Sequence, residues 1–138
     1  MAEVESTSVD ARRRSVPVRG GIAVALSVLV NVGLVVAVAA LGIAPGFQAL
    51  TVPPVAFLSA LGSIGALAVY WLLGRYTENQ DRLFVRIAAV VLVLSFVPDA
   101  ALLSVDPAAT VPGVVVLMIM HVVVAVASVW LLVYWVAR

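Results

Sequence analysis

The composition of this chain of 138 residues excludes a water-soluble globular domain, because 64% of its residues are apolar and only 11% are charged, against about 25% charged in soluble domains. The absence of cysteine excludes disulfides, thiolate metal sites and iron–sulfur clusters. A net charge of +1 and a single histidine favour neither a nucleic-acid partner nor a metal centre with three or four protein ligands. We therefore expect no cofactor, no metal and no nucleic acid.

Residues 1–19 differ from the rest of the chain, because they hold seven of its fifteen charged residues and few apolar ones. This composition predicts a disordered cytoplasmic tail over 1–19, followed by a four-helix transmembrane domain over 20–138. A cleaved signal peptide is the alternative interpretation. The apolar run over 21–43 argues against it, since it exceeds the ~7 to 15 residues of a signal-peptide core.

Four apolar stretches follow, each of 20 residues or more and long enough to cross a bilayer as a helix. They cover residues 21–43, 53–74, 83–104 and 112–137. Transmembrane strands are excluded, because they alternate apolar and polar residues over ~10 positions, whereas these stretches are apolar on all sides. The predicted fold class is all-α. The short connections between stretches predict an integral membrane bundle of four helices with up-down-up-down order.

The arginines predict the orientation of the bundle. Four precede the first stretch, three lie at or near the connection between the second and third, and Arg138 ends the chain, whereas the other two connections contain none. Positively charged residues are enriched on the cytoplasmic side of membrane proteins. We therefore expect a multi-pass protein of the cytoplasmic membrane with both termini in the cytoplasm.

A few polar residues interrupt the apolar stretches, and they form the candidate intramembrane site. Counting ~1.5 Å per residue from the helix ends puts Asn31, Ser63, Ser95 and His121 near the middle of the membrane, with Asp99 one turn from Ser95 on the same face. Ser27 and Ser59 precede Asn31 and Ser63 by one turn. Because lipid offers these groups no hydrogen bonds, we expect them to face the interior of the bundle.

Pro98 predicts a kink in the third helix, since proline removes a backbone N–H and frees the carbonyl of Leu94. Two interpretations of Asp99 remain open: that it and Ser95 satisfy backbone groups freed by the proline, or that Asp99 belongs to a ligand, ion or proton site. His121 is either a neutral imidazole bonded to Asn31 or to a carbonyl, or a proton carrier. Direct contact between Asp99 and His121 requires the third helix to lean toward the fourth.

Two segments carry a resemblance to a known family. RIAAVVLVLSFVPDAALL contains the pattern S-x-x-P-D at Ser95, Pro98 and Asp99, and VVVLMIMHVVVAVA contains the pair M-H at His121. With Asn31 and the segment GFQALTVPPVAFLSALG, they resemble a prokaryotic family of small four-transmembrane-helix proteins of unknown function. The resemblance covers about residues 20 to 137. It implies the four-helix architecture and no activity.

Taken together, these features predict a small, non-enzymatic binding or accessory protein with a polar intramembrane centre. Its expected partners are membrane lipids, a small-molecule ligand of unknown identity and, as an open alternative, further copies of itself. The rival interpretation is an oligomeric transporter or proton-coupled component that uses Asp99 and His121. A membrane enzyme is the weakest option, because the sequence offers one carboxyl group and one imidazole but no nucleophile or phosphate-binding loop.

Overall fold

A computed structural model describes residues 2–135, and it confirms the all-α prediction. Within these residues there are four long helices and no strand: α1 (Ala2–Ala40), α2 (Val52–Tyr76), α3 (Gln80–Val105) and α4 (Val111–Val129). A single 3-10 turn, η1 (Gln48–Leu50), precedes α2, and a five-residue π-helical turn, η2 (Trp130–Tyr134), continues α4. The chain is thus a helical bundle with short connections.

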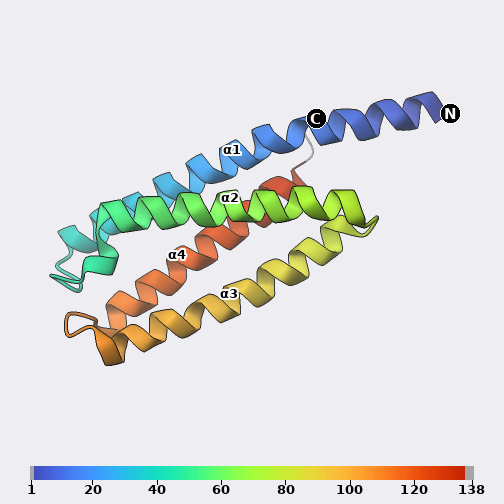
Figure 1. The fold of residues 1–138 in the computed structure, drawn as a ribbon. Helices are drawn as coiled ribbons and strands as arrows, with labels where there is room; N and C mark the ends of the chain where they lie inside the picture. Colours follow the sequence, from blue (N-terminus) through green and yellow to red (C-terminus); the bar gives the residue numbers. More distant parts are fainter. Residues whose placement is uncertain (1, 136–138) are drawn as a thin grey trace.

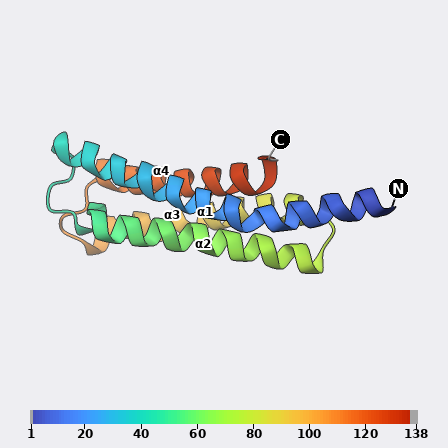
Figure 2. The same ribbon diagram turned by 90° about the horizontal axis from the view of Figure 1, so that it is seen from above.

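Successive helices run in opposite directions. The beginning of α1, the α2–α3 turn and the end of η2 lie toward one end of the bundle, whereas the α1–α2 and α3–α4 connections lie at the other (Figure 1). Seen from above, the axes of all four helices are roughly parallel (Figure 2). α1 packs against α2 and α4, and α3 packs mainly against α4. The predicted up-down-up-down order is confirmed.

Each helix is long and apolar enough to cross a membrane by length and composition. The candidate spans are Ser15–Ala40, Val52–Tyr76, Gln80–Val105 and Val111–Tyr134. Their outer surfaces carry large exposed apolar side chains such as Leu29, Phe57 and Val93. Exposure of so much apolar surface to water is unfavourable, whereas its contact with lipid is not. The fold is therefore that of a small multi-pass membrane protein.

The predicted disordered tail over 1–19 is wrong for the described residues, because α1 begins at Ala2 and runs without a break to Ala40. Residues 2–16 contain neither glycine nor proline, and Glu3 and Glu5 in the first turn complement the helix dipole. A helix that is stable in the membrane propagates into such a segment at little cost. Pro17 lies inside α1 without ending it. The predicted boundary at residue 20 also falls inside the first candidate span, which begins at Ser15.

Two apolar clusters close the ends of the bundle. The cluster at the end with the α1–α2 and α3–α4 connections includes Val35, Phe47, Val114 and Leu117. The cluster at the opposite end joins Val16, Tyr70, Phe84, Leu132 and Val133 from α1, α2, α3 and η2. The polar residues of the chain's apolar stretches lie between these clusters.

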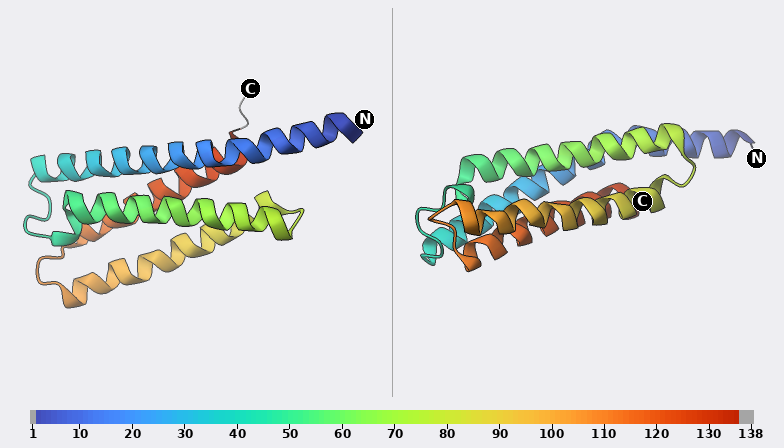
Figure 3. Two further views of the ribbon diagram at one scale, coloured as in Figure 1. Left: turned by 45° about the horizontal axis from the view of Figure 1, so that its top comes forward. Right: turned by 60° about the horizontal axis from the view of Figure 1, so that its bottom comes forward.

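The helix α3 buries only two of its residues against the rest of the bundle. Its buried residues are Phe84, in the second cluster, and Asp99. The helices α2 and α3 meet at their connecting turn and spread apart toward the other end (Figure 3). This divergence leaves space between α2, α3 and α4 at the level of the polar residues.

Candidate functional site

A hydrogen-bonded layer joins three helices near the middle of the bundle. The side-chain amide of Asn31 in α1 donates to Ser59 Oγ in α2 at 2.8 Å and to the carbonyl of Met120 in α4 at 3.3 Å. Asn31 is 1% exposed, and its Oδ1 has no hydrogen-bond partner among the described residues. The position of Asn31 in the interior confirms the expectation from its membrane depth.

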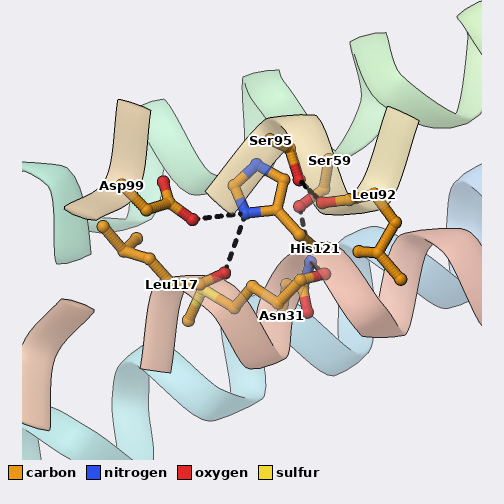
Figure 4. A network of polar contacts seen from close by, with 8 residues as sticks. Asn31, Ser59, Leu92, Ser95, Asp99, Leu117 and His121 are labelled. Atoms are coloured by element: carbon orange, nitrogen blue, oxygen red, sulfur yellow. Dashed lines mark hydrogen bonds and ion pairs between the residues drawn. The ribbon is translucent and has the colours of Figure 1, made fainter. Parts of the chain in front are cut away.

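Next to this layer, α3 and α4 are joined by Asp99 and His121 (Figure 4). Asp99 Oδ2 lies 3.0 Å from His121 Nδ1, and the carbonyl of Leu117, one turn earlier in α4, lies 2.9 Å from the same nitrogen. The geometry of a good hydrogen bond is met only toward Leu117, so Asp99 Oδ2 contacts the ring at an unfavourable angle. The direct contact that the sequence left conditional is therefore present.

The two oxygen neighbours determine which nitrogen of His121 carries hydrogen. Because a backbone carbonyl only accepts hydrogen bonds, the 2.9 Å contact with Leu117 requires a hydrogen on Nδ1. In the neutral ring this leaves Nε2 with a free lone pair. The side chain of His121 is 42% exposed, which makes Nε2 accessible to a molecule that enters the bundle.

Asn31, Ser59, Asp99 and His121 lie on the wall of a cavity of about 660 Å³ between α2, α3 and α4. Ser95 and Ser128 are its other polar lining residues, and the rest of the wall is aliphatic side chains, glycine, alanine, Pro54, Met120 and Phe84. No arginine or lysine of the described chain lines it. The cavity is thus an apolar space with a small polar region.

The cavity opens between α2 and α3. Its lining residues Leu58 and Leu61 on α2 and Val91 on α3 are 53 to 60% exposed, which marks them as the rim. These residues belong to the membrane-spanning parts of their helices. The opening therefore lies within the candidate spans and is bordered by apolar side chains.

The structure brings together Asn31, Ser95, Asp99 and His121 of the predicted site but not Ser63. The hydroxyl of Ser63 is buried without a partner among the described residues and does not line the cavity. Ser59, one turn earlier, takes the place that the sequence analysis gave to Ser63. A choice between two serines on one face depends on the exact height and rotation of the helix, which sequence spacing does not define.

Pro98 lies inside α3, which continues across it as one helix, so the predicted kink stays a prediction. The structural role suggested for its neighbours is not the one observed. Ser95 donates to the carbonyl of Leu92 at 2.6 Å, and neither Ser95 nor Asp99 bonds to the carbonyl of Leu94 in the described part of the chain. Of the two partners expected for a neutral His121, the ring bonds to a carbonyl, that of Leu117, and not to Asn31.

Two buried polar residues were missed as interior residues. Ser128 lies two turns after His121 in the same helix and lines the cavity, a spacing that could have indicated it. Arg19 is 4% exposed, and its guanidinium donates to the carbonyls of Leu132 and Trp135 at 2.9 and 3.1 Å, where η2 ends. Arg19, Ala23, Ser27 and Asn31 follow one another at intervals of four residues and are all buried, so they form one continuous buried stripe along α1.

The comparison with known proteins identifies the family of the chain. Residues 11–138 match the family described as "Family of unknown function (DUF6069)", and the chain belongs to that family. The match begins before residue 20, where the sequence resemblance was expected to begin. No curated protein and no solved structure matches the chain.

Proposed function

We propose that this protein binds a predominantly apolar molecule of the membrane in the cavity between α2, α3 and α4, and that it does so without catalysing a reaction. The observation that carries the proposal is the cavity itself. Its volume of about 660 Å³ falls in the range of ~300 to 1,000 Å³ that is typical of small-molecule sites. An apolar wall with a few convergent polar groups is the usual chemistry of such sites.

The opening of the cavity supports a ligand from the bilayer. The rim residues Leu58, Leu61 and Val91 are apolar and lie in the spanning segments, so a lipid-soluble molecule enters without crossing water. The weak burial of α3 supports entry as well, because a helix with few buried contacts separates from its neighbours at low cost. The proposed partners are therefore the membrane and one apolar small molecule.

Filling the cavity tests the proposal. A Cβ built at Gly65, which lines the cavity, meets no atom within 4 Å, so Gly65→Leu places a side chain in open space. We expect wild-type protein purified in mild detergent to retain a small apolar molecule that native mass spectrometry detects, and Gly65→Leu to lose most of it.

Gly33→Leu is the matched control. Gly33 also lies in a spanning helix and has no atom within 4 Å of a built Cβ, but it does not line the cavity. Both changes replace a helical glycine by a better helix former, so both variants should fold. Equal occupancy in Gly65→Leu and Gly33→Leu would contradict the proposal.

We also propose that both termini and the α2–α3 turn face the cytoplasm. The distribution of the arginines supports this orientation, and in the described residues the start of α1, the α2–α3 turn and the end of η2 lie toward one end of the bundle. Reporter fusions after Gln48, Glu78 and Asp106 provide the test. We expect cytoplasmic activity at Glu78 and external activity at Gln48 and Asp106, and the reverse pattern would refute the orientation.

A further inference from the structure

We infer that the molecule bound in this cavity is electrically neutral and donates a hydrogen bond from a hydroxyl group to Nε2 of His121, with an apolar chain lying between α2 and α3. This inference rests on the proposed binding function and names the class of its ligand. It is carried by the hydrogen-bonding state of His121 and by the charges and polarity of the cavity wall.

The first step is the direction of the hydrogen bond. Since Nδ1 carries the hydrogen that meets Leu117, the accessible Nε2 of the neutral ring is an acceptor. A ketone, ether or ester oxygen brings no hydrogen to this nitrogen. A hydroxyl group does, and its apolar surroundings exclude competing water, which makes the hydrogen bond stronger than in solvent.

The polar groups near His121 also favour a donor. The hydrogen of Ser95 is used on the carbonyl of Leu92, which leaves its oxygen as an acceptor. Asn31 uses its amide hydrogens on Ser59 and Met120, whereas its Oδ1 is buried without a partner among the described residues. Asp99 adds two further carboxyl oxygens. The polar region is therefore richer in acceptors than in donors.

The charges of the wall exclude an anionic head group. Asp99 and His121 are the only ionisable residues among those that line the cavity in the described chain. A phosphate or carboxylate would be placed beside Asp99 without an arginine or lysine to compensate, in a medium where an unpaired charge is costly. The head group that fits is a neutral hydroxyl.

The remaining wall determines the rest of the molecule. Aliphatic side chains from α2, α3 and α4 surround the polar region, and the rim opens to the bilayer. An unbranched or methyl-branched hydrocarbon chain can fill this space and leave through the rim. A long-chain or isoprenoid alcohol has this combination of parts.

Three probes that share one chain test the inference: farnesol, farnesyl methyl ether and farnesyl phosphate. Each is titrated into detergent-solubilised wild-type protein, and bound probe is counted by native mass spectrometry. We expect farnesol to bind about tenfold more tightly than the methyl ether, which corresponds to the loss of one hydrogen bond. Farnesyl phosphate should bind most weakly.

The variant His121→Phe removes Nε2 but keeps a flat ring of similar size. In this variant we expect farnesol affinity to fall to that of the methyl ether, while the methyl ether itself binds as it does to wild type. The comparison of the three probes on wild-type protein decides the question independently of how well this variant folds.

The outcomes separate the inference from the proposed function. Equal affinity for farnesol and its methyl ether, or tighter binding of the phosphate, would overturn the hydroxyl inference and leave an apolar binding cavity in place. Failure of all three probes to bind would overturn both. Selective binding of farnesol that disappears in His121→Phe would support both.

Discussion

Replacing Phe84 with alanine should lower the free energy of unfolding by about 3 to 5 kcal/mol, the largest loss we expect from a change in α3. Phe84 is 2% exposed and is the one buried apolar residue of this helix. Its ring meets that of Tyr70 edge to face, with 5.1 Å between centroids and 77° between planes, a favourable arrangement. Equilibrium unfolding in mixed detergent micelles measures the change.

Leu94→Ala is the control for Phe84→Ala. Leu94 lies in the same helix but is 61% exposed, so its side chain lies on the outer surface of the bundle. Its loss should change the free energy of unfolding by less than about 0.5 kcal/mol. If the two variants were equally stable, Phe84 would not anchor α3, and the helix would be held by contacts other than those described above.

The second large effect is expected on binding. Asp99→Asn should lower the affinity for farnesol about tenfold and leave that for farnesyl methyl ether unchanged, a difference of ~1.4 kcal/mol in binding free energy. Asp99→Asn replaces one of the two oxygen neighbours of His121 Nδ1 by an amide that can donate to this nitrogen, so the ring form with hydrogen on Nε2 competes with the form that bonds to Leu117. The form with hydrogen on Nε2 no longer accepts a hydrogen bond from the ligand. The titrations described for wild-type protein measure both affinities.

The stability of Asp99→Asn separates a binding role from a structural one. Asparagine preserves the volume of the side chain, and polar contacts inside membrane proteins contribute ~0.6 kcal/mol on average. We therefore expect the free energy of unfolding to fall by less than about 1 kcal/mol. Parallel losses of folding and binding in Asp99→Asn and His121→Ala would show instead that the pair is architectural.

The sequence was sufficient to predict the bundle because the prediction depends on the apolar character of whole stretches of 20 residues or more and not on single residues. Four apolar stretches of 20 residues or more leave no alternative to spanning helices, and short connections force neighbours to be antiparallel. The interior positions of Asn31 and Asp99 could also be predicted, since a polar group facing lipid has no hydrogen-bond partner. These arguments need only the approximate position of a residue along a helix.

The site depends on quantities that sequence spacing does not contain. The cavity exists because α2 and α3 diverge, and no residue pattern encodes the angle between two helices that are apolar on all sides. Whether Ser59 or Ser63 meets Asn31 is decided by a shift of one turn. The hydrogen on Nδ1 of His121 follows from a carbonyl of its own helix, four residues earlier, and becomes visible only with the side-chain conformation.

The start of α1 and the role of Arg19 were missed for a different reason. Charged residues before an apolar stretch are usually exposed, so the sequence analysis assigned them to a tail. In the structure the helix continues through them, and the guanidinium of Arg19 finds the backbone carbonyls at the end of η2. Such a contact joins residues more than 100 positions apart, and a charge count along the chain does not reveal it.

The single histidine of the chain permits one direct measurement of the central claim, that His121 presents an accepting nitrogen to a ligand in the cavity. Protein labelled with ¹⁵N-histidine and reconstituted in lipid gives one pair of ring signals. We predict a protonated Nδ1, an unprotonated Nε2, and a shift of the Nε2 signal when farnesol is added but not when its methyl ether is added. A protonated Nε2 in the free protein, or an Nε2 signal that stays unchanged at saturating farnesol, would contradict the account.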